Sequence, residues 1–453
     1  MSSEQEQFQN AILKGVKESL EAESKNRKLE VLDVFIPHQK AQTDIDQIRK
    51  TRIGRGTFAN KVFANVRISD KNTNRVIGEG KVHVADIPIK TPFNAYLIDG
   101  SYYQNTNQAQ LKGTAYTRKK SSGEIVSEFG LERGWNFNIN LDPETEKFSI
   151  KIGGSKYPLM PILKVLNVPE NKMISAWGNQ LYRNNQTDPD TDEKVVLNFA
   201  TKILGKKRLF GKKPDEVKEM VRNHFLVESE LNPEASKLTL GARYKNVSDD
   251  ALLSSTKKIL DVHSQKVEPD SRDELYYKRF RNISDTGYEW IKERKPAIVT
   301  KVRRRIESAE PGMKVNKIIG MDVVNPVVKS LFTQSKLRGA GDTTNLLDML
   351  SADSRVTIMG EHGIGSEYKI KNEARDVHPS SAGFIDPVMT PQGSAGKSEH
   401  LAVNTKIEGG QIWTKMINIK TGKSEFVSPE SLYGKNVAFP NELEFINGKY
   451  RIC

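Results

Sequence analysis

Apolar residues recur every four positions near the N-terminus, at Phe8, Ile12, Val16 and Leu20. In an α-helix, which has about 3.6 residues per turn, these side chains share one narrow face. The pattern therefore predicts an amphipathic helix within residues 1–30 that packs by that face. The apolar run over residues 31–36 ends at Pro37 and predicts a buried strand.

Strand patterns dominate the next part of the chain, from residue 60 to 118. Within it, Asp99 and Gly100 separate two apolar runs, and this dipeptide predicts a tight hairpin turn. Further on, residues 137–141 and 148–152 alternate between apolar and polar positions on either side of a turn sequence. This alternation predicts a second hairpin with one buried face.

Helical patterns follow the strands. Residues 180–270 are polar and helical, and a later long helical pattern includes residues 301–306. The basic run from Lys206 to Lys213 is either a phosphate contact or a solvated loop. The 453 residues suffice for about two to four domains. We therefore predict an α+β, multidomain fold.

The composition limits the kinds of partner and metal site that we expect for this chain. A formal charge of +13 and a pI near 9.4 favour a polyanionic partner. Because Cys453 is the single cysteine and the seven histidines show no metal-ligand spacing, no metal site is expected. The chain shows neither a signal-peptide pattern nor an apolar run of the roughly 18 residues that a membrane helix needs, so no membrane partner is expected.

The segment from Arg375 to Ser394 is unusually rich in residues that fix or free the backbone, namely Pro379, Gly383, Pro387, Pro391 and Gly393. These residues exclude an uninterrupted helix or a central strand. The segment is nevertheless too apolar to be a disordered tail. It is either a rigid, irregular functional surface or a proline-rich connector between domains.

The same segment resembles the signature R-D-V-H-P-(S/T)-H-x-G-R-x-C-P-x-E-T-P-E-G of the β subunit of multisubunit DNA-directed RNA polymerases. The matching residues are Arg375, Asp376, Val377, His378, Pro379, Ser380, Gly383, Pro387, Thr390, Pro391 and Gly393. Among the departures, Ser381 stands for the usual His, Phe384 for Arg and Asp386 for Cys. The resemblance implies a structural fork motif built by Arg375, Asp376, His378, Pro379, Pro387, Thr390, Pro391 and Gly393. For His378 we expect a structural hydrogen bond, for instance to Asp376, in preference to general-base catalysis.

Residues 337–360 resemble the family segment that lies beside the RNA–DNA hybrid, keeping Leu337, Asp342, Asn345, Leu347, Arg355 and Gly360. Arg355 is suited to bind phosphate, because a guanidinium is permanently charged and can donate two parallel hydrogen bonds. It could instead form an ion pair with Asp342 or Asp353.

A glycine-rich loop begins with Gly360-Glu-His-Gly-Ile-Gly365 and runs to about Lys371. It matches the family's fork loop at the downstream edge of the transcription bubble. The loop lacks the Lys-Ser/Thr of a nucleotide-binding P-loop. Its glycines would let the backbone approach nucleic acid closely. The nucleic-acid-binding residues implied by the resemblance are Asp342, Asn345, Arg355, Gly360, Gly363, Gly365, Lys369 and Lys371.

The resemblance implies modules that the family calls protrusion (1–118), lobe (119–268), a return segment of the protrusion (269–334), and the fork region with the start of the following β segment (335–453). It also implies the N-terminal fragment of a split β subunit, as in large-genome bacteriophages. Such a fragment would line the DNA cleft without carrying catalytic residues or a metal of its own.

The expected partners are a C-terminal β fragment, β′ or its fragments with Mg²⁺ at the active centre, a promoter-specificity subunit, and DNA and RNA. The expected location is the cytoplasm of an infected bacterial host, or the virion if the enzyme is packaged. The alternative is a basic nucleic-acid-binding or virion structural protein without a role in polymerisation.

The resemblance also predicts resistance to rifampicin, which in bacterial members binds a pocket lined by the stretch matching 336–360. Ala340 stands here for the family's Phe and Ala352 for its His. Losing an aromatic contact costs about 1.5–3 kcal/mol, and a lost hydrogen bond costs roughly 0.5–1.5 more. The assembled polymerase should therefore transcribe at concentrations that silence a bacterial host enzyme. Equal sensitivity in a runoff assay would contradict the ungapped alignment of 337–360.

Overall fold

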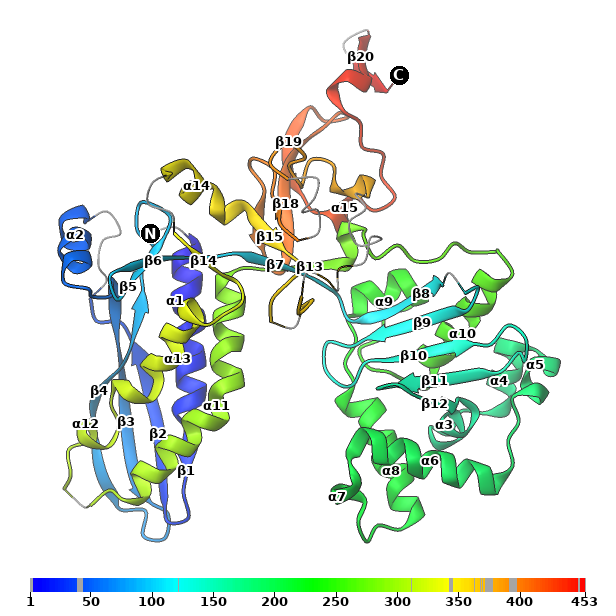
Figure 1. Ribbon diagram of the computed structural model, residues 1–453, viewed down its shortest axis with the longest axis horizontal. Coiled ribbons are helices and arrows are strands. Elements are labelled where there is room, and N and C mark those ends of the chain that lie inside the picture. The colour runs from blue at the N-terminus through cyan, green and yellow to red at the C-terminus, as the bar shows by residue number, and fades with distance from the viewer. Residues whose placement is uncertain are drawn as a thin grey trace. The chain divides into compact units, whose positions relative to one another are not determined.

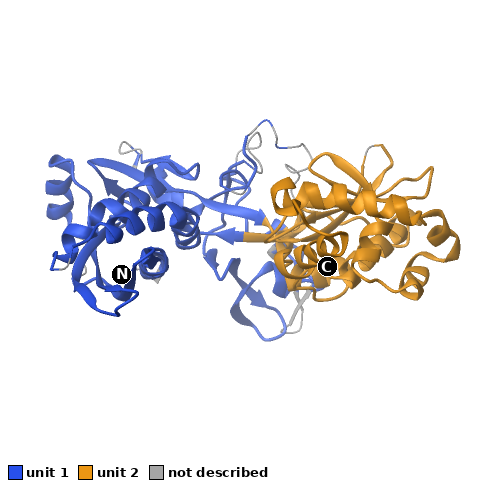
Figure 2. Ribbon diagram, turned by 90° about the horizontal axis from the view of Figure 1, so that it is seen from below, with its two compact units in different colours: residues 1–110, 280–377, 381–453 blue, residues 111–279, 378–380 orange. Residues whose placement is uncertain are grey.

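The computed structural model describes residues 3–38, 44–120, 122–310, 312–341, 345–361, 363–366, 368, 370, 378–390, 397–446 and 449–452. The chain forms two compact units (Figure 2). Unit 1 contains residues 1–110, 280–377 and 381–453, and unit 2 contains residues 111–279 and 378–380. Helices and strands occur in both units (Figure 1), so the predicted α+β, multidomain fold is confirmed.

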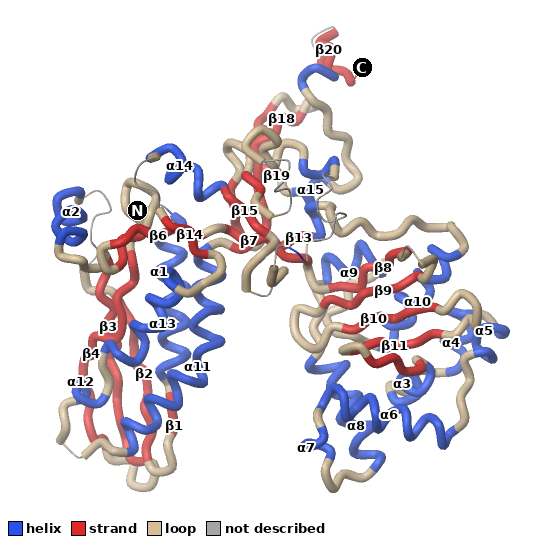
Figure 3. The backbone as a smooth tube through the Cα atoms, in the orientation of Figure 1, coloured by secondary structure: helices blue, strands red, loops and turns tan. Residues whose placement is uncertain are grey.

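Unit 1 is built around a four-stranded antiparallel sheet with long helices alongside it (Figure 3). In spatial order the strands are β1 (Ala22–Glu23), β2 (Arg27–Phe35), β3 (Ala59–Asp70) and β4 (Val76–Pro88). The helices of this part are α1 (Ser3–Leu20), α2 (Ile45–Ile53), α11 (Ile283–Glu307), α12 (Val315–Ile318) and α13 (Met321–Thr333). Apolar side chains of α1, α11, α13 and the sheet form one continuous core.

The predicted N-terminal helix is confirmed as α1, whose four periodic apolar side chains are all fully buried. The strand predicted over residues 31–36 exists as β2, but its burial is only partial. Val31 is buried, whereas Leu32 is 43% exposed. The reason is a bulge, because Val31 pairs with Val66 and Asp33 with Asn65, which leaves Leu32 as the extra residue.

The other strand groups lie wholly or mainly in unit 1. They are β5 (Tyr96–Ile98) with β6 (Ser101–Asn105) and β14 (Arg338–Ala340); β13 (Lys278–Arg281) with β7 (Asn107–Leu111), β15 (Arg355–Thr357) and β16 (Glu399–His400); β17 (Lys406–Glu408) with β18 (Gln411–Asn418) and β19 (Lys423–Val427); and β20 (Leu443–Ile446) with β21 (Lys449–Ile452). Two short helices, α14 (Leu346–Ser351) and α15 (Pro429–Leu432), lie in the same part of the chain. The predicted turn between β5 and β6 is confirmed, since Asp99 (φ 48°) and Gly100 (φ 82°) both adopt positive φ.

Unit 2 combines a five-stranded antiparallel sheet with a set of helices. The strands, in spatial order, are β12 (Ser155–Pro158), β11 (Phe148–Ile152), β10 (Phe137–Leu141), β9 (Ile125–Gly130) and β8 (Thr114–Lys119). The helices are α3 (Met160–Val165), α4 (Glu170–Trp177), α5 (Asn179–Asn184), α6 (Pro189–Leu204), α7 (Lys206–Leu209), α8 (Pro214–Asn223), a π-helical turn (His224–Glu228), α9 (Pro233–Leu240) and α10 (Asp249–His263). The predicted hairpin of β10 and β11 is confirmed, with Ile139 opposite Ile150 and both buried.

None of the helices in the described ranges is both long and apolar enough to cross a membrane. The assignment of parts of the chain to protrusion, lobe and fork modules, with the boundaries given above, stays a prediction.

Gly287 of α11 allows the close approach of α1 and predicts a strong mutational effect. A Cβ at this position would lie 3.0 Å from Ile12 Cδ1 and 3.1 Å from Phe8 Cε2, both in the core. Gly287→Leu should lower the free energy of unfolding by about 1–3 kcal/mol, because overpacking forces neighbouring side chains to move. Gly80→Leu is the control, since a Cβ there meets nothing within 4 Å. Equal urea midpoints for the two variants would contradict this packing.

Candidate nucleic-acid interface

The residues that match the hybrid-binding segment are placed by the short strand β15. β15 runs parallel to β7, with Val356 opposite Asn107, and antiparallel to β16, with Arg355 opposite His400. Three segments that are distant in the sequence therefore meet at Arg355. The sheet fixes the backbone of Arg355 and leaves its side chain 35% exposed.

The Arg355 guanidinium forms an ion pair with Asp348 of α14. Of the two partners considered from the sequence, Asp342 lies outside the described residues and Asp353 pairs with Lys90. Asn345 precedes α14 as its N-cap, and its Oδ1 accepts hydrogen bonds from Leu347 N at 3.1 Å and Asp348 N at 3.3 Å. Asn345 therefore holds the first turn of the helix that carries the partner of Arg355.

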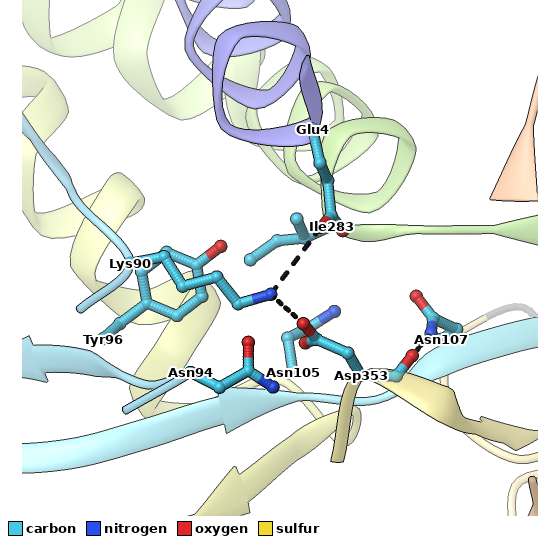
Figure 4. A pocket seen from close by; sticks show the side chains of 8 residues that line it. All are labelled: Glu4, Lys90, Asn94, Tyr96, Asn105, Asn107, Ile283 and Asp353. Atoms are coloured by element: carbon cyan, nitrogen blue, oxygen red, sulfur yellow. Dashed lines mark hydrogen bonds and ion pairs between the residues drawn. The ribbon is translucent and has the colours of Figure 1, made fainter. Parts of the chain in front are cut away.

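A small polar pocket of about 10 Å³, enough for roughly one water molecule, lies beside the start of β15. Figure 4 shows the Lys90 side chain pointing between Asp353 and Glu4 of α1. Lys90 pairs with Asp353, and its Nζ lies 3.6 Å from Glu4 Oε2. Asn107 donates to the carbonyl oxygens of Asp353 at 2.6 Å and Arg355 at 3.2 Å. These contacts set the position from which the Arg355 side chain extends.

The glycine-rich loop is held by Gln108 of β7, a residue that sequence reasoning missed. The Gln108 amide is fully buried and donates 2.8 Å hydrogen bonds to the carbonyl oxygens of Met359 and Glu361. A Cβ on Gly360 would lie 2.7 Å from Leu337 Cδ2, and one on Gly363 would lie 2.5 Å from the Ile358 carbonyl oxygen. These two glycines are therefore required by the packing of the protein itself.

Gly365 differs from those glycines, because a Cβ there would meet no atom within 4 Å. It remains a candidate for close approach to nucleic acid. Lys369 and Lys371, also expected to bind nucleic acid, lie outside the described residues. No sequence signal identified Gln108, because its partners lie about 250 positions further along the chain.

The segment from Arg375 to Ser394 is called the proline-rich motif below. Its first described part, residues 378–380, packs within unit 2. Ser380 N donates to His378 Nδ1 at 3.2 Å, so the ring proton resides on Nε2, which lies 3.5 Å from Glu274 Oε1. Ser380 Oγ accepts a 2.9 Å hydrogen bond from Leu275 N. Pro379 begins the 3₁₀ turn Pro379–Ser381. His378 thus makes structural contacts with Ser380 and Glu274; Asp376, its expected partner, lies outside the described residues.

The second part of the motif packs within unit 1. Asp386 Oδ1 accepts hydrogen bonds from Val388 N at 2.8 Å and Met389 N at 3.1 Å, which closes a turn around Pro387. Thr390 Oγ1 accepts a 3.1 Å hydrogen bond from His400 N. Phe384, at the position of the family's Arg, is buried. The remaining motif residues, Arg375, Pro391 and Gly393, lie outside the described residues.

Two carboxyl groups in the part of unit 2 that contacts His378 have raised pKa values. Burial, followed by the charges of Asp270 and Asp273, raises the pKa of Glu274 to about 7, and Lys258 opposes this shift. Burial also raises the pKa of Asp270, although Lys258 Nζ lies 2.6 Å from its Oδ1. Burial lowers the pKa of His378. Within the described ranges, no group of three or more His, Cys, Asp or Glu side chains is arranged to hold a metal ion.

Comparison with known proteins agrees with the motifs. Residues 340–407 match the family model "RNA polymerase Rpb2, domain 3". The chain is 21% identical over 418 residues to the DNA-directed RNA polymerase subunit beta of Gloeobacter violaceus, which covers 86% of this chain and 36% of the relative. The same subunit of Synechococcus elongatus is 23% identical over 85% of this chain and 36% of the relative, and that of Mesostigma viride is 23% identical over 78% and 34%.

The chain is therefore a distant homologue of the RNA polymerase β subunit over most of its length. It spans about one third of the length of these relatives. The family match includes Arg355, the glycine-rich loop and the proline-rich motif, so the resemblance inferred from those residues is confirmed at the level of the β subunit.

The raised pKa of Glu274 predicts a pH-dependent effect of its removal. The pKa of about 7 exceeds the ordinary value of 4.5, so the stability contributed by protonated Glu274 is fully present below pH 4.5 and is lost as the pH rises through 7. Glu274→Gln cannot ionise. Its unfolding free energy relative to wild type should therefore rise by about 2–3 kcal/mol between pH 4.5 and 8.

Urea unfolding of both proteins at the two pH values measures this difference. Asp142→Asn is the control, because hydrogen bonding from Glu144 N, with further bonds from Thr145, lowers the pKa of Asp142. Asp142 is then ionised at both pH values, and the effect of the control variant should stay constant. A constant effect of Glu274→Gln would contradict the electrostatics described for Glu274.

Proposed function

We propose that this chain forms the N-terminal part of the β subunit of a multisubunit DNA-dependent RNA polymerase, where it lines the DNA cleft and the fork beside the active centre. The observation that carries this proposal is the homology to β subunits over 86% of the chain, together with the family match over residues 340–407. The formal charge of +13 supports contact with nucleic acid.

Within this function, Arg355 contacts the phosphate backbone of the RNA–DNA hybrid. Its side chain is anchored through β15 and remains partly exposed, and Asp348 orients the guanidinium without covering it. A guanidinium has five N–H donors, so pairing with one carboxylate leaves donors for a phosphate. Gly365, Lys369 and Lys371 extend the same contact.

The chain acts as one fragment of a split β subunit of the kind encoded by large-genome bacteriophages. The divergence of the motif supports this, with Ser381, Phe384 and Asp386 at positions where cellular β subunits have His, Arg and Cys. The partners are then a C-terminal β fragment, β′ chains that hold Mg²⁺, and a promoter-specificity subunit. The complex works in the cytoplasm of the infected bacterium or is packaged in the virion.

Isolation of the native complex from infected cells tests this proposal. We expect this chain to copurify with β′ polypeptides and a separate C-terminal β polypeptide, and to have an intact mass near 51.0 kDa. A much larger polypeptide that contains this sequence would contradict the split subunit alone. Recovery of the chain without any polymerase polypeptide would contradict the polymerase function and favour a basic virion protein.

Arg355 and Asp348 give a paired prediction. Arg355→Ala should weaken the elongation complex by about 1.5–3 kcal/mol, whatever the template sequence, because phosphates carry no base identity. Asp348→Asn should leave the complex equally or more stable, since it frees the guanidinium for phosphate. Dissociation of stalled complexes at moderate salt measures both. If both variants weaken the complex equally, the ion pair is purely structural and the phosphate contact is wrong.

A further inference from the structure

A rigid turn in unit 2 presents an aromatic side chain to solvent. Phe210 follows α7 with φ −61° and ψ 125°, Gly211 has φ 75°, and Lys212 N donates a 3.1 Å hydrogen bond to the Leu209 carbonyl oxygen. These values define a type II turn, in which only glycine is well suited to the position after Phe210. The turn therefore fixes the backbone of Phe210 at its corner.

The Phe210 side chain is 92% exposed at this corner. Among the large apolar side chains of the described residues, Tyr368 alone is more exposed. Neither the helices nor the sheet of unit 2 covers the ring, although a phenylalanine gains stability when it is buried. An aromatic ring that a hydrogen-bonded turn holds in solvent is available to pack against a binding partner.

Cations flank Phe210 on both sides in the sequence. Lys206, Lys207 and Arg208 precede it, and Lys212 and Lys213 follow it. Lys212 forms an ion pair with Glu216 at 2.9 Å, whereas the other four form no ion pair with a described residue. Arg208 also lines an open groove of about 350 Å³ in unit 2, together with Arg133 and Trp135.

We propose that the turn over residues 206–213 binds single-stranded nucleic acid, with Phe210 stacked on a base and the flanking cations on the adjacent phosphates. Every base of a single strand has an aromatic face with a phosphate on either side, which matches one ring between two groups of cations. In an apolar protein pocket, the same cations would lose water without gaining partners. This proposal rests on the proposed function in one respect only, namely that the single strand comes from the nucleic acid of a transcribing polymerase.

Binding of the full chain to fluorescently labelled oligonucleotides tests the proposal. The probes are oligothymidylate and oligouridylate, each of about 20 nucleotides, and a duplex of the same length. Phe210→Ala and Phe210→Leu should each weaken single-strand binding about 5- to 100-fold, because base stacking is lost, whereas Phe210→Trp should keep it. Val267→Ala, at an exposed apolar residue elsewhere in unit 2, is the matched control and should have no effect.

Salt dependence separates stacking from charge. Lys207→Ala and Arg208→Ala should each reduce the slope of log affinity against log salt by about 0.7, the value for one phosphate contact on a single strand. Phe210→Ala should lower the affinity and leave the slope unchanged. Because all three side chains are exposed, these substitutions should not disturb the fold, and circular dichroism checks this.

Two results of the binding measurements would overturn the proposal. One is equal single-strand affinity for wild type, Phe210→Ala and Phe210→Leu, which leaves the run as a solvated basic loop. The other is tighter binding of the duplex than of either single strand.

A crosslinking experiment tests the same contact in the assembled polymerase. A photoreactive phenylalanine analogue at position 210 should crosslink to nucleic acid. Capture of a polypeptide alone would assign the turn to protein docking and reject the proposal.

The preference between the DNA and RNA probes identifies the strand that the turn binds. A chain that binds single strands through Phe210 but does not copurify with polymerase polypeptides would retain this inference while the proposed function fails. The two failures are therefore distinguishable.

Discussion

The buried amide of Gln108 connects three parts of unit 1 that are far apart in the sequence. Its nitrogen donates to the carbonyl oxygens of Met359 and Glu361, and its oxygen accepts a 3.0 Å hydrogen bond from Arg281 Nη1. Leaving buried carbonyl oxygens without donors costs about 1–3 kcal/mol each. Without this amide, the Met359 carbonyl oxygen would lose its donor on β7, and the Glu361 carbonyl oxygen would keep only the 3.2 Å hydrogen bond from Gln110 Nε2. Arg281 would lose a neutral partner at the end of β13.

The rest of the candidate interface follows from the same strand. Asn107, the neighbour of Gln108 on β7, holds the carbonyl oxygens of Asp353 and Arg355. Successive side chains of β7 therefore hold two different parts of the candidate interface, one at the start of β15 and one in the loop that follows it. The residues of the candidate interface lie on short elements, which do not fix side-chain positions well on their own. The buried amides of Asn107 and Gln108 hold the backbone of these elements in place.

Local patterns predicted the elements whose stability comes from near neighbours. The fourfold repeat of α1 and the alternation of β10 and β11 were sufficient, because periodicity reports directly which face is buried. The burial predicted for Leu32 was wrong, because a bulge depends on how the partner strand pairs. The nucleic-acid contacts expected for the glycines of the loop stay a prediction. In the structure Gly360 and Gly363 lie close to Gln108, a contact that spans about 250 residues and leaves no local signal.

The ion pair between Arg355 and Asp348 affects which anions can bind at Arg355. A cation that already has a carboxylate partner adds less to the indiscriminate attraction of anions than a free cation does. A phosphate can bind at this guanidinium only where it reaches the N–H donors that the carboxylate leaves open. In a chain with a formal charge of +13, such a paired arginine selects anions by their geometry, whereas an unpaired cation attracts any polyanion.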